Sequence, residues 1–205
     1  MCTAALAQSN PVLVVGTTSN AFTSYYTEIV RAEGFSGASY ADLTTVNASV
    51  LASRDVVILG ETPLTAAQVT MFADWVTAGG KLIAMRPDKQ LAGLLGLTTT
   101  PNTLAEGYLL INTSQAPGAG LVSQTIQFHG TADRYTLSGA TAVATLYSTS
   151  TVATANPAVT LRSVGALGGQ AAAFTYDLAR SIVYTRQGNP NWAGTERDGI
   201  PPVRS

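Results

Sequence analysis

Two unbroken aliphatic runs constrain the fold of this 205-residue chain more than any other feature. Residues 12–15 read Val-Leu-Val-Val and end at Gly16, and residues 55–60 read Asp-Val-Val-Ile-Leu-Gly. A strand with one face in water alternates apolar and polar residues, whereas a strand covered on both faces is continuously apolar. The two runs therefore predict interior strands of a parallel sheet with helices on both faces.

A helix is predicted between the first run and Gly34. Ser19 or Asn20 can cap it, because their side-chain oxygens accept hydrogen bonds from the free amides of a first turn. Its apolar residues recur at helical spacing and are Phe22, Tyr26, Ile29 and Val30. Residues 38–43 then have the pattern of a short strand, and residues 48–53 that of a short helix.

The same alternation continues to about residue 96. Thr65 and Gln68 have the spacing of a capping box, in which each side chain satisfies a backbone amide of the other residue. The helix that they open ends at Gly79, and residues 81–85 form the next strand. Pro87 marks the start of a further helix, whose apolar face comprises Leu91, Leu94 and Leu95. Four strand–helix pairs in succession predict a parallel sheet with right-handed crossovers.

The second half of the chain has short strands without room for a helix between each pair, so some of them should pair antiparallel. These strands are expected at residues 108–111, 142–146, 158–161 and 171–175, with a closing helix at 177–185. The predicted fold is therefore α/β: a flavodoxin-like three-layer sandwich with a mostly parallel sheet. We expect an N-terminal extension at residues 1–10, one domain at 11–188 and an irregular tail at 189–205.

Composition excludes several classes of protein. Charged residues make up 11% of the chain and hydrophobic residues 46%, which is typical of a folded domain and not of a disordered chain. The 11 basic and 12 acidic side chains nearly cancel, so nucleic acid is not an expected partner. The apolar runs are far shorter than the roughly 18–20 residues that span a bilayer. The Ala5-Leu6-Ala7 sequence has the form of a signal-peptidase site and indicates export.

The sequence predicts neither a cofactor nor a metal ion. The turn after the first strand reads Gly16-Thr-Thr-Ser-Asn, which lacks the glycines of a dinucleotide site. Cys2 lies in the N-terminal extension, and His129 is the only imidazole, so a histidine-rich metal site is excluded. His129 is either a structural residue or, with Asp133 four residues later, part of a polar site.

Candidate site residues follow from the rule that ligands of open α/β sheets bind at the carboxyl ends of the strands. Glu61, Arg86 and Asp88 each come shortly after a predicted strand and could meet in one crevice. An arginine–carboxylate pair that only closes the top of the sheet would produce the same pattern. Both interpretations remain open at this point.

Three segments together resemble one superfamily. Residues 55–61, followed by a helix that ends Asp74-Trp-Val-Thr-Ala-Gly-Gly and a strand at 81–85, are similar to the core of the class I glutamine amidotransferase-like superfamily. The elements His129-Gly-x-x-Asp133-x-Tyr135 and 168–177, which ends at Asp177, resemble its trehalose-utilisation-like proteins and the trimerisation domain of some β-galactosidases. The resemblance implies an amidotransferase-like fold over residues 11–180. Arg86, Asp133, Tyr135 and Asp177 are the candidate ligand-binding residues.

The chain differs from the amidotransferases at the positions of their catalytic residues. They carry a cysteine between glycines after the strand that corresponds to residues 81–85, whereas this chain has Arg86-Pro87-Asp88, and their His-x-Glu element is absent. The resemblance therefore implies a non-catalytic scaffold or interaction domain of a larger exported protein related to carbohydrates, with a neighbouring domain of the same polypeptide as its partner.

Two alternatives belong to other classes. One is a hydrolase in which Glu61, Asp88 and His129 converge at the carboxyl end of the sheet. The other is a sugar-binding module, whose aromatic platform would come from Tyr25, Tyr26, Tyr135 or Trp192. Trp192 lies in the expected tail, and we predict that it packs back on the domain because burial of its large ring is favourable.

Overall fold

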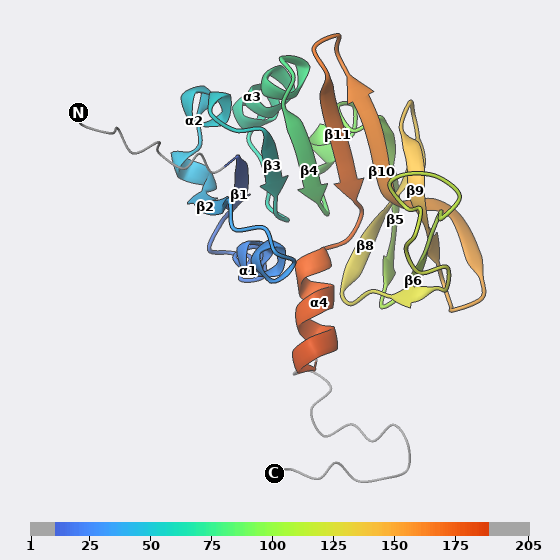
Figure 1. Ribbon diagram of the computed structural model, residues 1–205. Coiled ribbons are helices and arrows are strands. Elements are labelled where there is room, and N and C mark those ends of the chain that lie inside the picture. Colours follow the sequence, from blue (N-terminus) through green and yellow to red (C-terminus); the bar gives the residue numbers. More distant parts are fainter. Residues whose placement is uncertain (1–10, 189–205) are drawn as a thin grey trace, which may run out of the picture.

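The computed structural model describes residues 11–188 of the chain (Figure 1). The predictions for the N-terminal extension, the tail and Trp192 concern residues outside this range. In chain order, the first half contains β1 (Val12–Gly16), α1 (Tyr25–Ala32), β2 (Ala38–Asp42), the 3-10 helix η1 (Leu43–Thr45), α2 (Ala48–Ala52), β3 (Val56–Leu59), α3 (Ala66–Thr77), β4 (Lys81–Met85) and the 3-10 helix η2 (Lys89–Leu91). The second half contains β5 (Leu97–Ala105), β6 (Tyr108–Ile111), β7 (Ile126–Gln127), β8 (Thr131–Leu137), β9 (Thr141–Tyr147), β10 (Ala153–Val164), β11 (Gly169–Phe174) and α4 (Leu178–Gln187).

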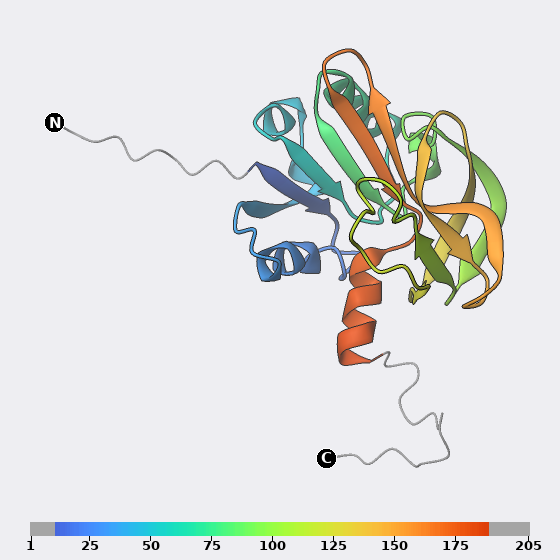
Figure 2. The same cartoon turned by 45° about the vertical axis from the view of Figure 1, so that its right-hand side comes forward.

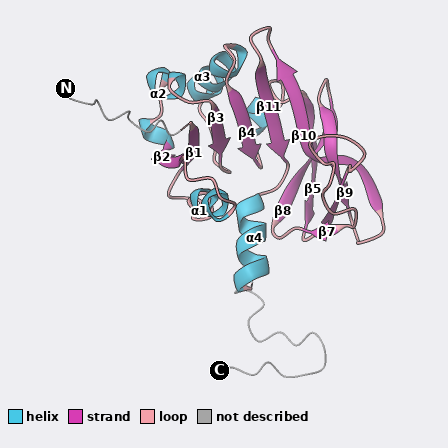
Figure 3. Cartoon of the chain, viewed as in Figure 1, coloured by secondary structure: helices cyan, strands magenta, loops and turns pink. Residues whose placement is uncertain are grey.

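Nine strands form one mixed sheet in the order β2-β1-β3-β4-β11-β10-β9-β6-β7. Figure 3 shows the strands from β2 to β10 of this sheet in a row. Neighbours from β2 to β11 are parallel, and neighbours from β11 to β7 are antiparallel. The remaining strands, β5 and β8, form a separate antiparallel pair. The predicted α/β class is confirmed, but half of the pairings in the large sheet are antiparallel, so the sheet is not mostly parallel.

Helices cover both faces of the parallel half. Leu13 on β1 packs with Phe72 of α3, whereas the next residue, Val14, packs on the opposite face with Tyr26 of α1 and Ala179 of α4. Figures 1 and 2 both show α1 and α4 side by side below the parallel strands. On the α3 face, the antiparallel half is covered by the β5–β8 pair, because β8 packs on β10. A uniform three-layer sandwich with helices on both faces is therefore not confirmed.

Short sequence patterns correctly predicted where most helices and strands of the parallel half lie. The capping box is present, since Thr65 Oγ1 accepts a hydrogen bond from the amide of Gln68, and the Gln68 side chain accepts one from the amide of Thr65. The first helix begins later than predicted. Asn20 Oδ1 accepts a hydrogen bond from the amide of Phe22 in a turn before α1, and α1 starts only at Tyr25.

One prediction for the middle of the chain was wrong, and two strands there were not predicted. The helix expected after Pro87 is only the three-residue η2, because Asp88 caps a 3-10 turn and Gly96, at φ +66°, turns the chain into β5. Its apolar residues are nevertheless placed as expected, since Leu91 and Leu95 are fully buried. Strands β5 and β8 were not predicted, because their exposed threonine-rich ends lack an apolar run.

Thr23 fills the space between the carboxyl ends of β1 and β3. Its side chain is fully buried, and a Cβ atom added to Gly16 or Gly60 would overlap it. In sheets with the order 2-1-3-4, ligands bind where the connections from neighbouring strands diverge, here between β1 and β3. The two glycines therefore leave room for the Thr23 side chain, which packs directly against the ends of both strands.

Replacement of Gly60 by alanine tests this close contact. Because the new methyl group would overlap Thr23, Gly60→Ala should lower the free energy of unfolding by about 1–3 kcal/mol, the usual cost of overpacking. Gly93→Ala is the matched control, since a Cβ there meets no atom within 4 Å. Urea denaturation measures both variants, and equal stability of the two would show that the contact is not tight.

Candidate functional site

The carboxyl ends of β1, β3 and β4 open on a polar cleft of about 650 Å³. The residues that line it come from the loops after these strands, from β8 and from α4: Ser19, Asn20, Ala21, Phe22, Glu61, Thr62, Pro63, Arg86, Pro87, Asp88, Lys89, Asp133 and Arg180. Four of the predicted site residues, Glu61, Arg86, Asp88 and Asp133, are therefore brought together. His129, Tyr135 and Asp177 are not among the lining residues.

Arg86 links two of the acidic residues in the cleft. Its Nη1 donates a hydrogen bond of 2.7 Å to Glu61 Oε1, and its Nε lies 3.3 Å from Asp133 Oδ2. Arg86 follows β4 directly and has φ +37°, a conformation that costs free energy for a residue with a Cβ. Its amide donates to the carbonyl of Phe174 at 2.7 Å, which holds this turn against the end of β11.

Arg180 is a cleft residue that the sequence did not indicate. It lies in the first turn of α4, where its Nη2 is 3.9 Å from Glu61 Oε2 and its guanidinium stacks 4.9 Å above the ring of Phe22. We call Glu61, Arg86, Asp133 and Arg180 the carboxyl-edge cluster. Its two cations and two anions give the cluster a formal net charge of zero.

Asp88 performs a structural task at the rim of the cleft. Its Oδ2 accepts a hydrogen bond from the amide of Leu64 at 2.8 Å, and its Oδ1 accepts one from the amide of Gln90 at 2.9 Å. Both carboxylate oxygens are therefore bonded to backbone groups that fix η2 and the start of α3. The two amide hydrogen bonds account for the position of Asp88 at the rim without a catalytic role.

Asp177 is buried behind the cleft and joins α4 to α1. Its carboxylate caps α4 by accepting hydrogen bonds from the amides of Ala179 and Arg180. Tyr26 Oη donates to it at 2.7 Å, and Asn20 Nδ2 donates at 3.1 Å. With 3% of its surface exposed, Asp177 holds the helix in place and is not accessible to a ligand.

Tyr135 and Tyr26 are core residues. Tyr135 is fully buried on β8 and donates a hydrogen bond to the carbonyl of Pro87 at 3.3 Å. Burial raises the pKa of Tyr135 well above its ordinary value, and the nearby Asp133 carboxylate raises it further. Burial and the Asp177 carboxylate likewise raise the pKa of Tyr26. Neither ring offers a surface on which a sugar could stack.

His129 pairs with a residue that the sequence did not single out. Its Nδ1 lies 2.9 Å from Glu106 Oε2, while Glu106 Oε1 accepts a 2.7 Å hydrogen bond from the amide of Gly130. Glu106 itself has φ +48°, so these two contacts hold a strained turn between β5 and β6. Ser181 of α4 accepts a hydrogen bond from the amide of His129. A glutamate between Ala105 and Gly107 gives no signal in the sequence that would predict this pair.

The charged side chains of the carboxyl-edge cluster are therefore paired with one another, and the described contacts do not place two residues of the cleft as a general acid and a general base. Glu61 is held by two arginines, Asp88 by two amides, and His129 pairs with Glu106. Among residues 11–188, no three histidine, cysteine or acidic side chains gather as metal ligands. No helix in this range is long and apolar enough to cross a membrane.

The buried tyrosines predict a loss of stability at alkaline pH. The pKa values of Tyr26, Tyr135 and Tyr176 are raised in the folded chain, so above about pH 10 the unfolded chain releases protons that the folded chain keeps. The free energy of unfolding should be unaffected by these groups below pH 10. It should then fall by about 1.4 kcal/mol per pH unit for each tyrosine.

Tyr176→Phe tests this explanation, because it removes one buried phenol without changing the ring. Denaturation at pH 9 to 11.5 should give a shallower slope for this variant. Phe128→Leu, beside Tyr176, serves as the control: it should lower stability at every pH without altering the slope. An unchanged slope in Tyr176→Phe would contradict the explanation.

Comparisons with known proteins show the fold. A scan against protein-family models gives no match, and a search of curated proteins gives none. Among solved structures, the chain is similar to a β-galactosidase from Rahnella sp. R3, with 16% identity and a TM-score of 0.63 over 93% of this chain and 33% of that chain. It is similar to α-L-fucosidase isoenzyme 2 from Paenibacillus thiaminolyticus, with 13% identity and a TM-score of 0.62 over 86% of this chain and 30% of that chain.

The fold also occurs outside glycosidases. The mmIFT52 N-terminal domain is similar with 14% identity and a TM-score of 0.56, over 83% of this chain and 87% of that chain. The chain spans about a third of the length of the two glycosidases that it matches. Its fold is therefore shared with domain-sized parts of carbohydrate-processing enzymes and with one isolated domain of another protein.

Proposed function

We propose that this chain is a non-catalytic accessory domain of a larger, exported, carbohydrate-related protein, in which it acts as a scaffold or interaction module. The main support for the proposal is that the structural alignment covers nearly all of this chain but only a third of the enzyme that it matches. Nearly all of this chain, 93%, corresponds to only 33% of the Rahnella β-galactosidase. A unit of this size in a larger enzyme has its neighbouring domain as its natural partner.

The carboxyl-edge cluster supports the non-catalytic part of the proposal. Acid–base catalysis requires a carboxyl group that can exchange a proton with a substrate. Glu61 is instead bonded to Arg86, and Asp88 is bonded to two backbone amides. These contacts favour the structural interpretation of the pattern, an arginine–carboxylate pair that closes the top of the sheet.

The amidotransferase-like relationship is part of the same proposal. It is supported by the β2-β1-β3-β4 order of parallel strands and by the residue directly after β4, where the amidotransferases carry their cysteine. Here that residue is Arg86, which has a positive φ in the turn after β4 and whose guanidinium is hydrogen-bonded to Glu61. The turn thus presents an ion-pairing group in place of a nucleophile. Export is supported by the Thr-rich composition with only two lysines.

A sugar-binding module is less well supported by the described residues. Sugars usually stack on an exposed aromatic face, but Tyr26 and Tyr135 are buried. Tyr25 is half-buried against the core and does not line the cleft. Phe22 is the aromatic residue that lines the cleft, and the guanidinium of Arg180 covers its ring.

An assay for turnover tests the proposal against the hydrolase alternative. The chain is incubated with p-nitrophenyl glycosides, p-nitrophenyl esters and glutamine, together with Glu61→Gln and Asp88→Asn as matched variants that remove one carboxylate each. We expect product release by all three proteins to equal the buffer blank. Turnover that co-elutes with the chain and is lost in either variant would contradict the proposal and support a hydrolase.

A further inference from the structure

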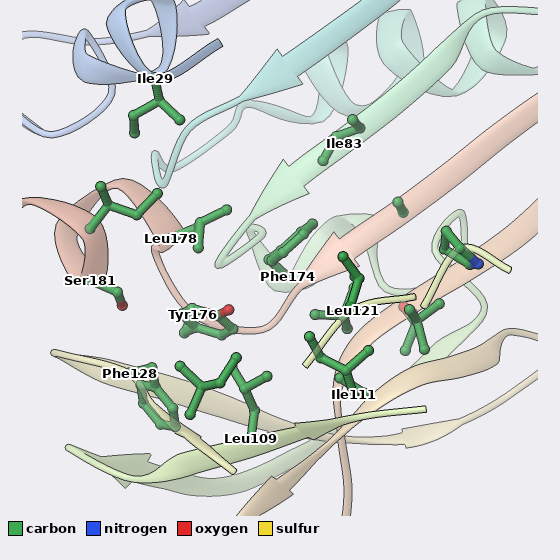
Figure 4. Close-up of a pocket in the computed structure, with 18 of the residues that line it drawn as sticks. Ile29, Ile83, Leu109, Ile111, Leu121, Phe128, Phe174, Tyr176, Leu178 and Ser181 are labelled. Atoms are coloured by element: carbon green, nitrogen blue, oxygen red, sulfur yellow. The ribbon is translucent and has the colours of Figure 1, made fainter. Parts of the chain in front are cut away.

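An apolar cavity of about 580 Å³ lies on the sheet face that carries α1 and α4. Its floor is formed by strands from β4 to β6, and its walls by α4 and by the segment 112–125 between β6 and β7. Figure 4 shows Phe174, Leu178 and Ile111 around it, contributed by β11, α4 and β6. The cavity is separate from the polar cleft, since the two share no lining residue.

The interior of the cavity is unsuited to a sugar. Most of the buried lining side chains are apolar or aromatic, and Leu109, Phe128 and Ala144 are each at most 5% exposed. Thr160 also lines the cavity; it is fully buried, and its hydroxyl has no hydrogen-bond partner among the described residues. A hydroxyl or charged group placed among the apolar side chains without a hydrogen-bond partner would cost several kcal/mol. Apolar cavities of this kind stay dry and take up apolar molecules.

The lining of the cavity spans five neighbouring strands of the sheet. It runs across the sheet from Ile83 on β4 to Leu109 on β6, which are four strands apart in the order β4-β11-β10-β9-β6. At about 4.8 Å per strand this distance is about 19 Å, so a volume of 580 Å³ corresponds to a mean cross-section of about 30 Å². A single extended hydrocarbon chain fits within this length and cross-section.

Polar side chains occur at the rim and carry no net charge. Glu33 at the end of α1 and Arg186 at the end of α4 both line the opening, with Gln127 and Thr185 nearby. All four residues are exposed. The opposite charges of Glu33 and Arg186 cancel, while Gln127 and Thr185 offer hydrogen bonds to an uncharged group.

We propose that this cavity binds one linear hydrocarbon chain that ends in a small uncharged polar group, as in a fatty alcohol. The chain lies across the strands under segment 112–125, and its polar end meets Gln127 and Thr185 at the rim. The proposal is independent of the accessory function, because it rests on the cavity and not on the carboxyl-edge cluster.

The test uses N-phenyl-1-naphthylamine, an uncharged dye that fluoresces when it enters an apolar site. The full 205-residue chain should bind it saturably at one site per chain, and 1-decanol, but not galactose, should displace it. Ala172→Phe fills the floor of the cavity and Leu178→Gln makes its wall polar, so each should weaken binding at least tenfold. Leu167→Gln is the matched control, because Leu167 is 72% exposed and does not line the cavity, and it should bind the dye normally.

Four outcomes would overturn the proposal. The first is an absence of dye binding, and the second is binding that both cavity variants retain while circular dichroism shows them folded. The third is binding only by a chain that ends at residue 188, which would mean that residues 189–205 occupy the cavity. The fourth is binding that disappears as sedimentation shows two chains associating, which would make the cavity an interface between copies.

Discussion

The parallel pairing of β11 with β4 is the interaction on which the rest of the structure depends. β11 is bonded to β4 on one side and antiparallel to β10 on the other, so it joins the two halves of the sheet. Its residues are small where α3 lies close: a Cβ on Gly169 would strike the carbonyl of Val76, and Ala171 and Ala173 are buried in the same core. A larger residue at these positions would push α3 off the sheet.

The same strand determines where the polar cleft and the apolar cavity lie. On the face opposite α3, Ala172 and Phe174 form part of the floor of the cavity. At the carboxyl end of β11, the carbonyl of Phe174 accepts a hydrogen bond from the amide of Arg86. From there the chain continues through Asp177 into α4. β11 therefore brings Arg180 to the cleft and Leu178 to the cavity, which explains why two chemically different sites share one helix.

Local chemistry made the parallel half predictable. The aliphatic runs of β1 and β3 and the capping box of α3 are signals within a few residues, and the structure places all of them as predicted. The carboxyl-end rule also gathered Glu61, Arg86 and Asp88 in one cleft, because the ends of parallel strands necessarily share an edge.

The features that the sequence did not predict depend on contacts between residues far apart in the chain. Glu106 meets His129, and Arg180 meets Glu61, across 23 and 119 positions, and neither pair leaves a local pattern in the sequence. The β5–β8 pair was missed for a related reason, since its stability comes from packing on β10 and not from an apolar run of its own. The antiparallel pairing of β9 with β10 and of β10 with β11 joins consecutive strands through short connections, and the spacing of these strands had predicted it.

The central claim is that the carboxyl-edge cluster serves the fold and not a reaction. A double-mutant cycle on Glu61→Gln and Arg86→Gln tests it most directly, with the free energy of unfolding measured by urea denaturation. Each single variant removes the shortest ion pair of the cluster and leaves the remaining charge with only its longer contact, Arg86 to Asp133 or Glu61 to Arg180, so each should be destabilised by about 1–3 kcal/mol, less than a fully buried pair would lose. The double variant should recover about 1 kcal/mol or more of the summed loss. Residues retained for catalysis often reduce stability, so single variants more stable than the original chain would contradict the claim.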